Sequence, residues 1–242
     1  MSKFSEGKIV GWTQSKYEDI YIWESGTLAS FRGRMKLAFE LAAHFDDANR
    51  GDLQNAARRN AVVNMVSSLE VYFRDLIVAR TGDWEMDGFS ELLKDKMSLN
   101  DAYDYFKGTT VTKEALVANH YSFQSIESIA FVFDRLTGCD FLKCIDNAEY
   151  VDFVGDSPIG YCTFRGHFPE WRKLLADVFN TRHKIVHEAK LDYTLIEEDW
   201  IDYHGLLNTL PYAVEWALGE LYTERCYNKF RHDTENPDDL PF

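Results

Sequence analysis

Hydrophobic residues recur every three or four positions over much of the chain, which is the spacing of amphipathic helices. The first such stretch runs from Leu28 to Asn49, with polar residues between its apolar positions. Gly51-Asp52 interrupts the pattern, and Asp52 is suited to cap a second long helix from Leu53 to Arg80. The apolar positions of the first stretch are Leu28, Phe31, Met35, Leu37, Ala38, Leu41, Ala42 and Phe45.

The segment from Trp84 to Gly166 carries shorter signals. The sequence predicts helices at Glu91–Lys96, Leu99–Phe106, Lys113–His120 and Ser122–Leu136. Gly, Pro and β-branched or aromatic residues between Tyr150 and His167 favour a loop with room for a short strand. We interpret residues 84–166 as an insertion between the helices of one bundle.

Two further long helices are predicted near the C-terminus. The first begins around Pro169 and ends near Lys190, with proline in its first turn and lysine at its negative end. The second spans Glu197 to Arg225, with a bend expected near Pro211 because proline removes a backbone hydrogen bond. The predicted class is all-α, with an arm at 1–26, a single helical domain at 27–230 and an acidic tail at 231–242.

The net charge of −14 excludes a surface that is basic throughout. Positive charge is concentrated from Arg165 to Lys190, where six Lys or Arg and three Asp or Glu give a local net charge of +3. The N-terminus lacks the features of a signal peptide, and no stretch has the ~18 apolar residues that cross a membrane. We therefore expect no membrane partner. The four cysteines include no CxxC pair, which argues against a zinc site and predicts free thiols in a reducing cytoplasm.

One residue breaks the apolar stripe of the Pro169–Lys190 helix. Arg182 occupies a position close to the centre of that stripe, where the spacing calls for an apolar side chain. A guanidinium cannot be neutralised and rarely stays buried without a partner, so Arg182 either pairs internally or faces a cleft. The stripe consists of Trp171, Leu174, Leu175, Val178, Phe179, Ile185, Val186 and Ala189.

The Leu53–Arg80 helix has a matching irregularity. Glu70 lies on the face that carries Val63, Val66, Phe73 and Ile77. Because one stripe holds a lone acid and the other a lone Arg182, we predict that the two side chains lie near each other. Such a pair is either a salt bridge that fixes helix register or a part of a functional site.

His187 lies about 140° around the helix from Arg182 and is expected to point away from the core. His183 shares this outward face one turn earlier. Their i, i+4 spacing is that of metal ligands, but the HExxH pattern is absent. Two other interpretations stay open: acid–base chemistry by an exposed imidazole beside a cation, or two surface histidines without a role.

The hexapeptide from Arg182 to His187 resembles the RX4–6H signature of the HEPN superfamily, in which a polar residue, here His183, follows the arginine. The segment Ser67–Leu76, with Glu70, resembles the earlier core helix of that family, which often carries a glutamate. The resemblance covers about Leu28–Arg80 and Phe168–Arg225, and the middle of the chain lies outside it.

This resemblance implies a HEPN-like helical bundle with an elaborated helical insertion. It also implies a homodimer, in which the motifs of the two protomers face each other and form one composite cleft. Many HEPN members are endoribonucleases that need no metal or other cofactor and act in toxin–antitoxin or anti-phage defence systems. The implied reaction is attack of the RNA 2′-hydroxyl on the adjacent phosphate, leaving a 2′,3′-cyclic phosphate. In these terms His187 is the acid–base group, Arg182 holds the phosphate, His183 is secondary and Glu70 orients Arg182.

The basic segment supplies the expected RNA contacts, at Lys184, Arg172 and Lys173, although each also fits a solvated helix face. An antitoxin protein is a further partner that the resemblance implies. Two other functions compete with the nuclease. One is a non-catalytic HEPN-like module for dimerisation or partner binding, and the other is a helical metal hydrolase that uses His183 and His187.

Overall fold

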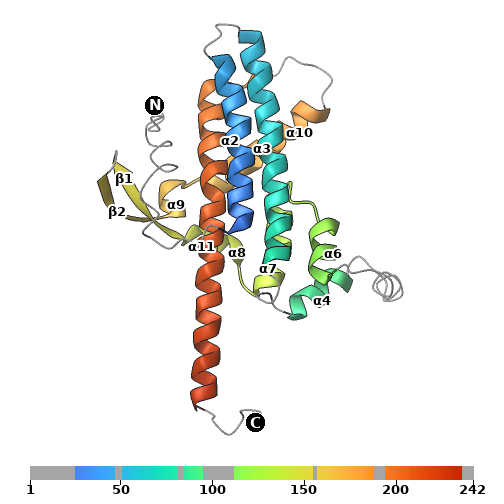
Figure 1. Cartoon of the computed structure of the whole chain (residues 1–242), viewed down its shortest axis with the longest axis vertical. Coiled ribbons are helices and arrows are strands. Elements are labelled where there is room, and N and C mark those ends of the chain that lie inside the picture. The colour runs from blue at the N-terminus through green and yellow to red at the C-terminus, as the bar shows by residue number, and fades with distance from the viewer. Residues whose placement is uncertain are drawn as a thin grey trace.

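The computed structural model describes residues 25–46, 51–80, 84, 86–94, 112–154, 157–187 and 194–235. Over these residues the chain is mainly helical, with one two-stranded antiparallel sheet. Three long helices lie side by side: α2 (Gly26–Asp46), α3 (Gly51–Ala79) and α11 (Glu197–Glu235) (Figure 1). In this view α3 and α11 run downward, α2 runs upward between them, and α11 extends beyond the other two.

Helix α2 begins at Gly26, two residues before the predicted start at Leu28. Ser25 Oγ accepts a hydrogen bond from the Leu28 backbone N–H at 3.1 Å, so Ser25 caps the helix and Gly26 belongs to it. Residues 1–24 of the predicted arm lie outside the described residues. The expected cap of α3 is also shifted, because this helix begins at Gly51 and Asp52 lies in its first turn.

The core is built from most of the predicted stripe positions, although Val186 of the Pro169–Lys190 stripe is 46% exposed. Phe31 of α2 contacts Tyr72 of α3 with ring centroids 5.3 Å apart, and both side chains are buried. Leu37 and Leu41, predicted as part of the α2 stripe, are instead 69% and 44% exposed. They lie about 60° (Leu41) and 100° (Leu37) around the helix from the buried Ala38, so the buried face of α2 is narrower than the spacing predicted.

The inserted segment contains α4 (Met86–Lys94), α6 (Lys113–His120), α7 (Ile126–Thr137) and α8 (Phe141–Asp146). Within this segment, α4, α6 and α7 lie around the lower end of α3 in Figure 1, whereas α8 contacts α11. The α6 bounds match the prediction, while α7 begins four residues later than expected because Ser125 caps it by accepting from the Ser128 N–H at 3.1 Å. The spacing of apolar residues did not predict α8. The predicted helix at Leu99–Phe106 lies outside the described residues.

The described residues are mostly helical, consistent with the predicted all-α class, and they include one β-hairpin. Strands β1 (Glu149–Val154) and β2 (Ser157–Thr163) pair antiparallel, from Glu149 opposite Thr163 to Val154 opposite Ser157. The stretch that was expected to be mostly loop is rich in β-branched and aromatic residues, which favour a pleated strand. A short helix, α9 (Phe164–His167), follows β2 and leads into α10 (Trp171–His187).

Asp146 of α8 fixes the start of α10. Its Oδ1 accepts from Trp171 Nε1 at 2.7 Å, and its Oδ2 accepts from Arg172 Nη2 at 2.7 Å. The helix then ends at His187, and its predicted extension to Lys190 lies outside the described residues. The final helix α11 contains Pro211 and continues to Glu235, ten residues beyond the predicted end at Arg225.

None of the described helices combines the length and the apolar character needed to cross a lipid bilayer.

His204 of α11 makes the stability of the fold dependent on pH. Its ring stacks on Phe39 with centroids 4.0 Å apart, and its buried Nδ1 has no partner among the described residues. Burial lowers the pKa of His204 to about 4, from an unfolded value near 6.5. The unfolded chain therefore takes up a proton first as the pH falls, and folding loses about 3 kcal/mol between pH 6.5 and pH 4.

His204→Phe should remove this part of the pH dependence, because a phenyl ring keeps the stacking and takes no proton. Urea unfolding measured at several pH values between 4 and 7 tests the prediction. His44→Phe, at an exposed histidine of α2, should retain the wild-type slope. An unchanged slope in His204→Phe would contradict the assignment.

Candidate functional site

Arg182 lies near the end of α10 and is half-buried. Its Nη1 donates to Gln124 Oε1 at 3.1 Å, and its Nε is buried without a hydrogen-bond partner among the described residues. The fully buried member of this turn is its neighbour Thr181, whose Oγ1 lies 3.1 Å from Tyr203 Oη. Arg182 therefore lies at the edge of the buried stripe rather than at its centre.

Glu70 and Arg182 are connected through a third residue. Gln124 Nε2 donates to Glu70 Oε2 at 2.7 Å, while Gln124 Oε1 accepts from Arg182. The direct ion-pair partner of Glu70 is Arg74, one turn later on α3, whose Nη2 lies 2.7 Å from Glu70 Oε1. The predicted nearness of Glu70 and Arg182 is thus a bridge through an amide, not a salt bridge.

This bridge has a definite charge distribution. The Glu70 side chain is only 12% exposed, and both of its oxygens accept hydrogen bonds. Arg74 balances its negative charge, and Gln124 is neutral. Among the described residues Arg182 forms no ion pair, so its positive charge is held in place without being matched by a carboxylate.

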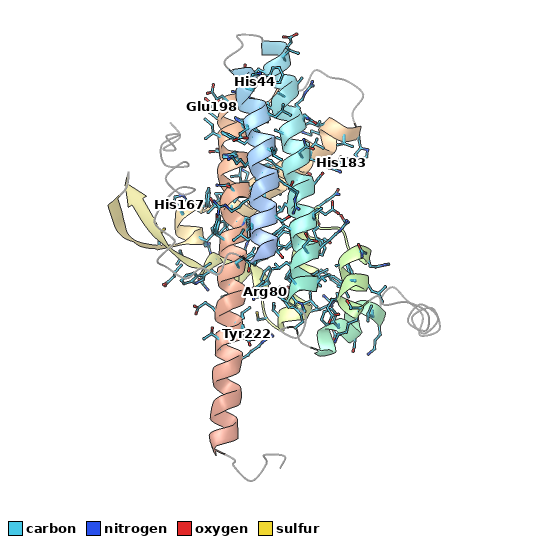
Figure 2. The ribbon with its side chains drawn as sticks, viewed as in Figure 1. His44, Arg80, His167, His183, Glu198 and Tyr222 are labelled. Carbon is cyan, nitrogen blue, oxygen red and sulfur yellow. The ribbon has the colours of Figure 1, made fainter. Side chains whose placement is uncertain are left out.

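His183 and His187 are both exposed on the outer face of α10, as their spacing predicted. Their ring centroids lie 4.6 Å apart. In Figure 2 the end of α10 emerges beside α3 and His183 points away from the long helices. Arg182 thus lies at the edge of the buried face of α10, and the two imidazoles of the same last turns face outward.

The predicted RNA-contacting residues do not form one patch. Lys184 is exposed beside His183 and His187. Arg172 is at the opposite end of α10, about 22 Å from His187 along the helix axis, and forms an ion pair with Asp146 at 2.7 Å. Lys173, next to Arg172, is exposed. Lys184 is therefore the one of the three that accompanies the histidines.

Other chemistry has less support in the described part of the chain. No group of three or more His, Cys, Asp or Glu side chains there could hold a metal ion. Cys139 and Cys144 lie close together, with their Sγ atoms 3.5 Å apart, although the sequence contains no CxxC pair. Burial and the neighbouring Cys139 raise the pKa of Cys144 to about 12, which keeps this thiol protonated and weakly nucleophilic.

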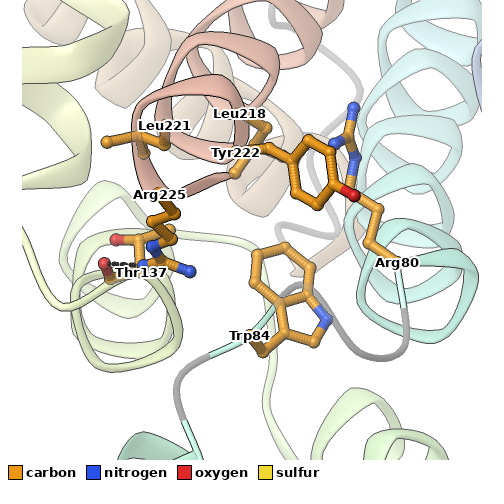
Figure 3. A pocket seen from close by; sticks show the side chains of 7 residues that line it. All are labelled: Arg80, Trp84, Thr137, Leu218, Leu221, Tyr222 and Arg225. Carbon is orange, nitrogen blue, oxygen red and sulfur yellow. Dashed lines mark hydrogen bonds between the residues drawn. The ribbon is translucent and has the colours of Figure 1, made fainter. Parts of the chain in front are cut away.

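A small open hollow lies between the end of α3 and the middle of α11 (Figure 3). Its polar groups are already engaged: Arg80 pairs with Glu215, Trp84 Nε1 donates to the Ile77 carbonyl, and Arg225 donates to the Thr137 carbonyl. The hollow contains none of the predicted site residues. We therefore place the candidate site at the end of α10 rather than here.

Sequence reasoning did not find Gln124 or Arg74. Gln124 precedes a helix cap in an irregular stretch, where periodicity carries no information about side-chain partners. Arg74 is an i+4 neighbour of Glu70, a spacing that does signal an ion pair on a helix.

No protein-family model, no curated protein and no solved structure matches the chain. The candidate site therefore depends on the residues around Arg182 and His187.

Proposed function

We propose that this protein is a metal-independent endoribonuclease of the HEPN type, with Arg182 and His187 as its reacting groups. The observation that carries the proposal is the state of Arg182: a guanidinium held by Gln124, with no carboxylate partner among the described residues, next to two exposed imidazoles. Glu70 does not supply that carboxylate, because its ion pair is with Arg74 on the same helix.

The chemistry needs a base, an acid and a cation. A base removes the proton of the RNA 2′-hydroxyl, the 2′-oxygen attacks the adjacent phosphorus, and the bond to the 5′-oxygen breaks as that oxygen gains a proton. Histidine exchanges protons readily near neutral pH, which suits His187 for this transfer. Arg182 would stabilise the negative charge that develops on the phosphate, and a guanidinium can do so with two parallel hydrogen bonds.

A homodimer would bring the two kinds of group together. Arg182 lies at the edge of the buried face of α10 and His187 faces outward, about 140° apart on the same helix. Across a two-fold axis, His187 of one protomer can approach the phosphate that Arg182 of the other holds. The exposed Lys184 would then contact a neighbouring phosphate of the RNA. A role in toxin–antitoxin or anti-phage defence, with an antitoxin as protein partner, belongs to this proposal.

The proposed function is tested with purified protein and total RNA in buffer that contains EDTA. We expect cleavage with unchanged rate after metal removal, because the mechanism uses only side chains. The products should carry 2′,3′-cyclic phosphate and 5′-hydroxyl ends, which selective end-labelling distinguishes from 5′-phosphate ends. Activity that EDTA abolishes would point to a metal hydrolase using His183 and His187. A protein that cleaves no RNA would favour the partner-binding alternative.

A further inference from the structure

Gln124 belongs to the inserted segment for which the sequence suggested no role. It connects α6 to α7 and is held on both sides. The preceding Phe123 is fully buried and packs on Phe73 of α3 with ring centroids 5.8 Å apart. The following Ser125 caps α7. Since Phe73 lies one turn beyond Glu70 on α3, this packing presents the Gln124 amide to the Glu70 carboxylate.

The Gln124 amide uses its donor toward one neighbour and its acceptor toward the other. Its NH₂ group donates to Glu70 at 2.7 Å, and its carbonyl accepts from Arg182 at 3.1 Å. A glutamate at this position would place a second carboxylate against Glu70 and would neutralise Arg182. A lysine or arginine could not accept from Arg182. Glutamine alone among the longer polar side chains satisfies both partners.

We infer that Gln124 is a positioning residue, which holds the Arg182 guanidinium for an RNA phosphate while leaving its positive charge unmatched. The inference rests on the proposed function, since it assigns Arg182 to a phosphate. It adds that the insertion is part of the site: the segment between α6 and α7 sets the geometry of Arg182, and the α3 pair of Glu70 and Arg74 anchors that segment.

Three variants distinguish the effect of orienting Arg182 from the effect of balancing its positive charge. Gln124→Glu keeps the shape and gives Arg182 a carboxylate partner that competes with phosphate. Gln124→Leu removes both hydrogen bonds and leaves the Arg182 charge. Asn119→Glu adds the same negative charge at an exposed position of α6, and so controls for the change in net charge. Thermal unfolding verifies that each variant is folded.

Binding is measured first, with a short polyuridine whose riboses are 2′-O-methylated, so that the proposed cleavage cannot occur. The affinity is recorded at several salt concentrations. We expect Gln124→Glu to reduce the slope of log affinity against log salt by about 0.7, the value for one lost phosphate contact on a single strand, as Arg182→Gln does. Gln124→Leu and Asn119→Glu should keep the wild-type slope.

Cleavage is measured next, on unmodified RNA. Gln124→Leu should slow the cleavage step by about tenfold to a hundredfold, because a charge-assisted hydrogen bond no longer orients Arg182. A wild type that binds with the expected slope pattern but never cleaves would overturn the nuclease and leave Gln124 as a positioning residue for phosphate binding. Equal slopes in Gln124→Glu and wild type, or no Arg182-dependent binding, would overturn the inference about Gln124.

Discussion

Replacing His187 with alanine is expected to reduce RNA cleavage by about 10²–10⁴-fold, the contribution typical of a single acid–base group. The imidazole is exposed at the end of α10, so its removal takes away a proton-transfer group without opening a cavity in the core. Stability should change by no more than about 0.5 kcal/mol, as for other exposed positions. The mass of the particle in solution should also stay the same.

The measurement is a single-turnover cleavage rate on a labelled RNA, with the unfolding midpoint recorded on the same preparation. His44→Ala serves as the matched control, because it removes an exposed histidine from α2 rather than from α10 (Figure 2). His183→Ala should have a smaller effect than His187→Ala, since His183 is assigned a secondary role. A His187→Ala protein that cleaves at the wild-type rate would remove His187 from the reaction, whatever the source of the activity.

The long helices were predictable because their information is local. A stripe of apolar residues at helical spacing requires one buried face, and α2, α3 and α10 each begin within a few residues of the predicted start. The exposed Leu37 and Leu41 show the limit of this argument. Spacing identifies residues that share a face, but the packing of neighbouring helices decides how much of that face is covered.

The bridge at Arg182 was only partly predictable, for a different reason. A charged residue inside an apolar stripe signals a partner, and this signal led from Arg182 to Glu70. The residue that joins them, Gln124, is 54 positions from Glu70 and 58 from Arg182 along the chain. No local pattern in the sequence encodes a contact over that separation, because it depends on how Phe123 packs against α3. The same holds for the Asp146 contacts that fix the start of α10.

Replacing Glu215 with alanine is expected to destabilise the fold by about 3–5 kcal/mol, which is the usual cost of breaking a buried ion pair by removing one partner. The Glu215 side chain is only 6% exposed. It accepts from Ser25 Oγ at 2.6 Å and from Arg80 Nη2 at 2.6 Å, so it joins the start of α2 and the end of α3 to α11. Burial and the nearby Glu215 also raise the pKa of Tyr72 well above its usual value.

Urea unfolding compares Glu215→Ala with Glu220→Ala, a control on an exposed position of the same helix that should change stability by less than about 0.5 kcal/mol. The joint variant Arg80→Met/Glu215→Leu decides between two sources of the loss. If an uncompensated charge at Arg80 causes it, the joint variant should be more stable than Glu215→Ala, because apolar side chains of similar size can replace a buried pair. If the joint variant is as unstable as Glu215→Ala, the loss comes from the cap at Ser25 and the packing of α2, which neither replacement restores.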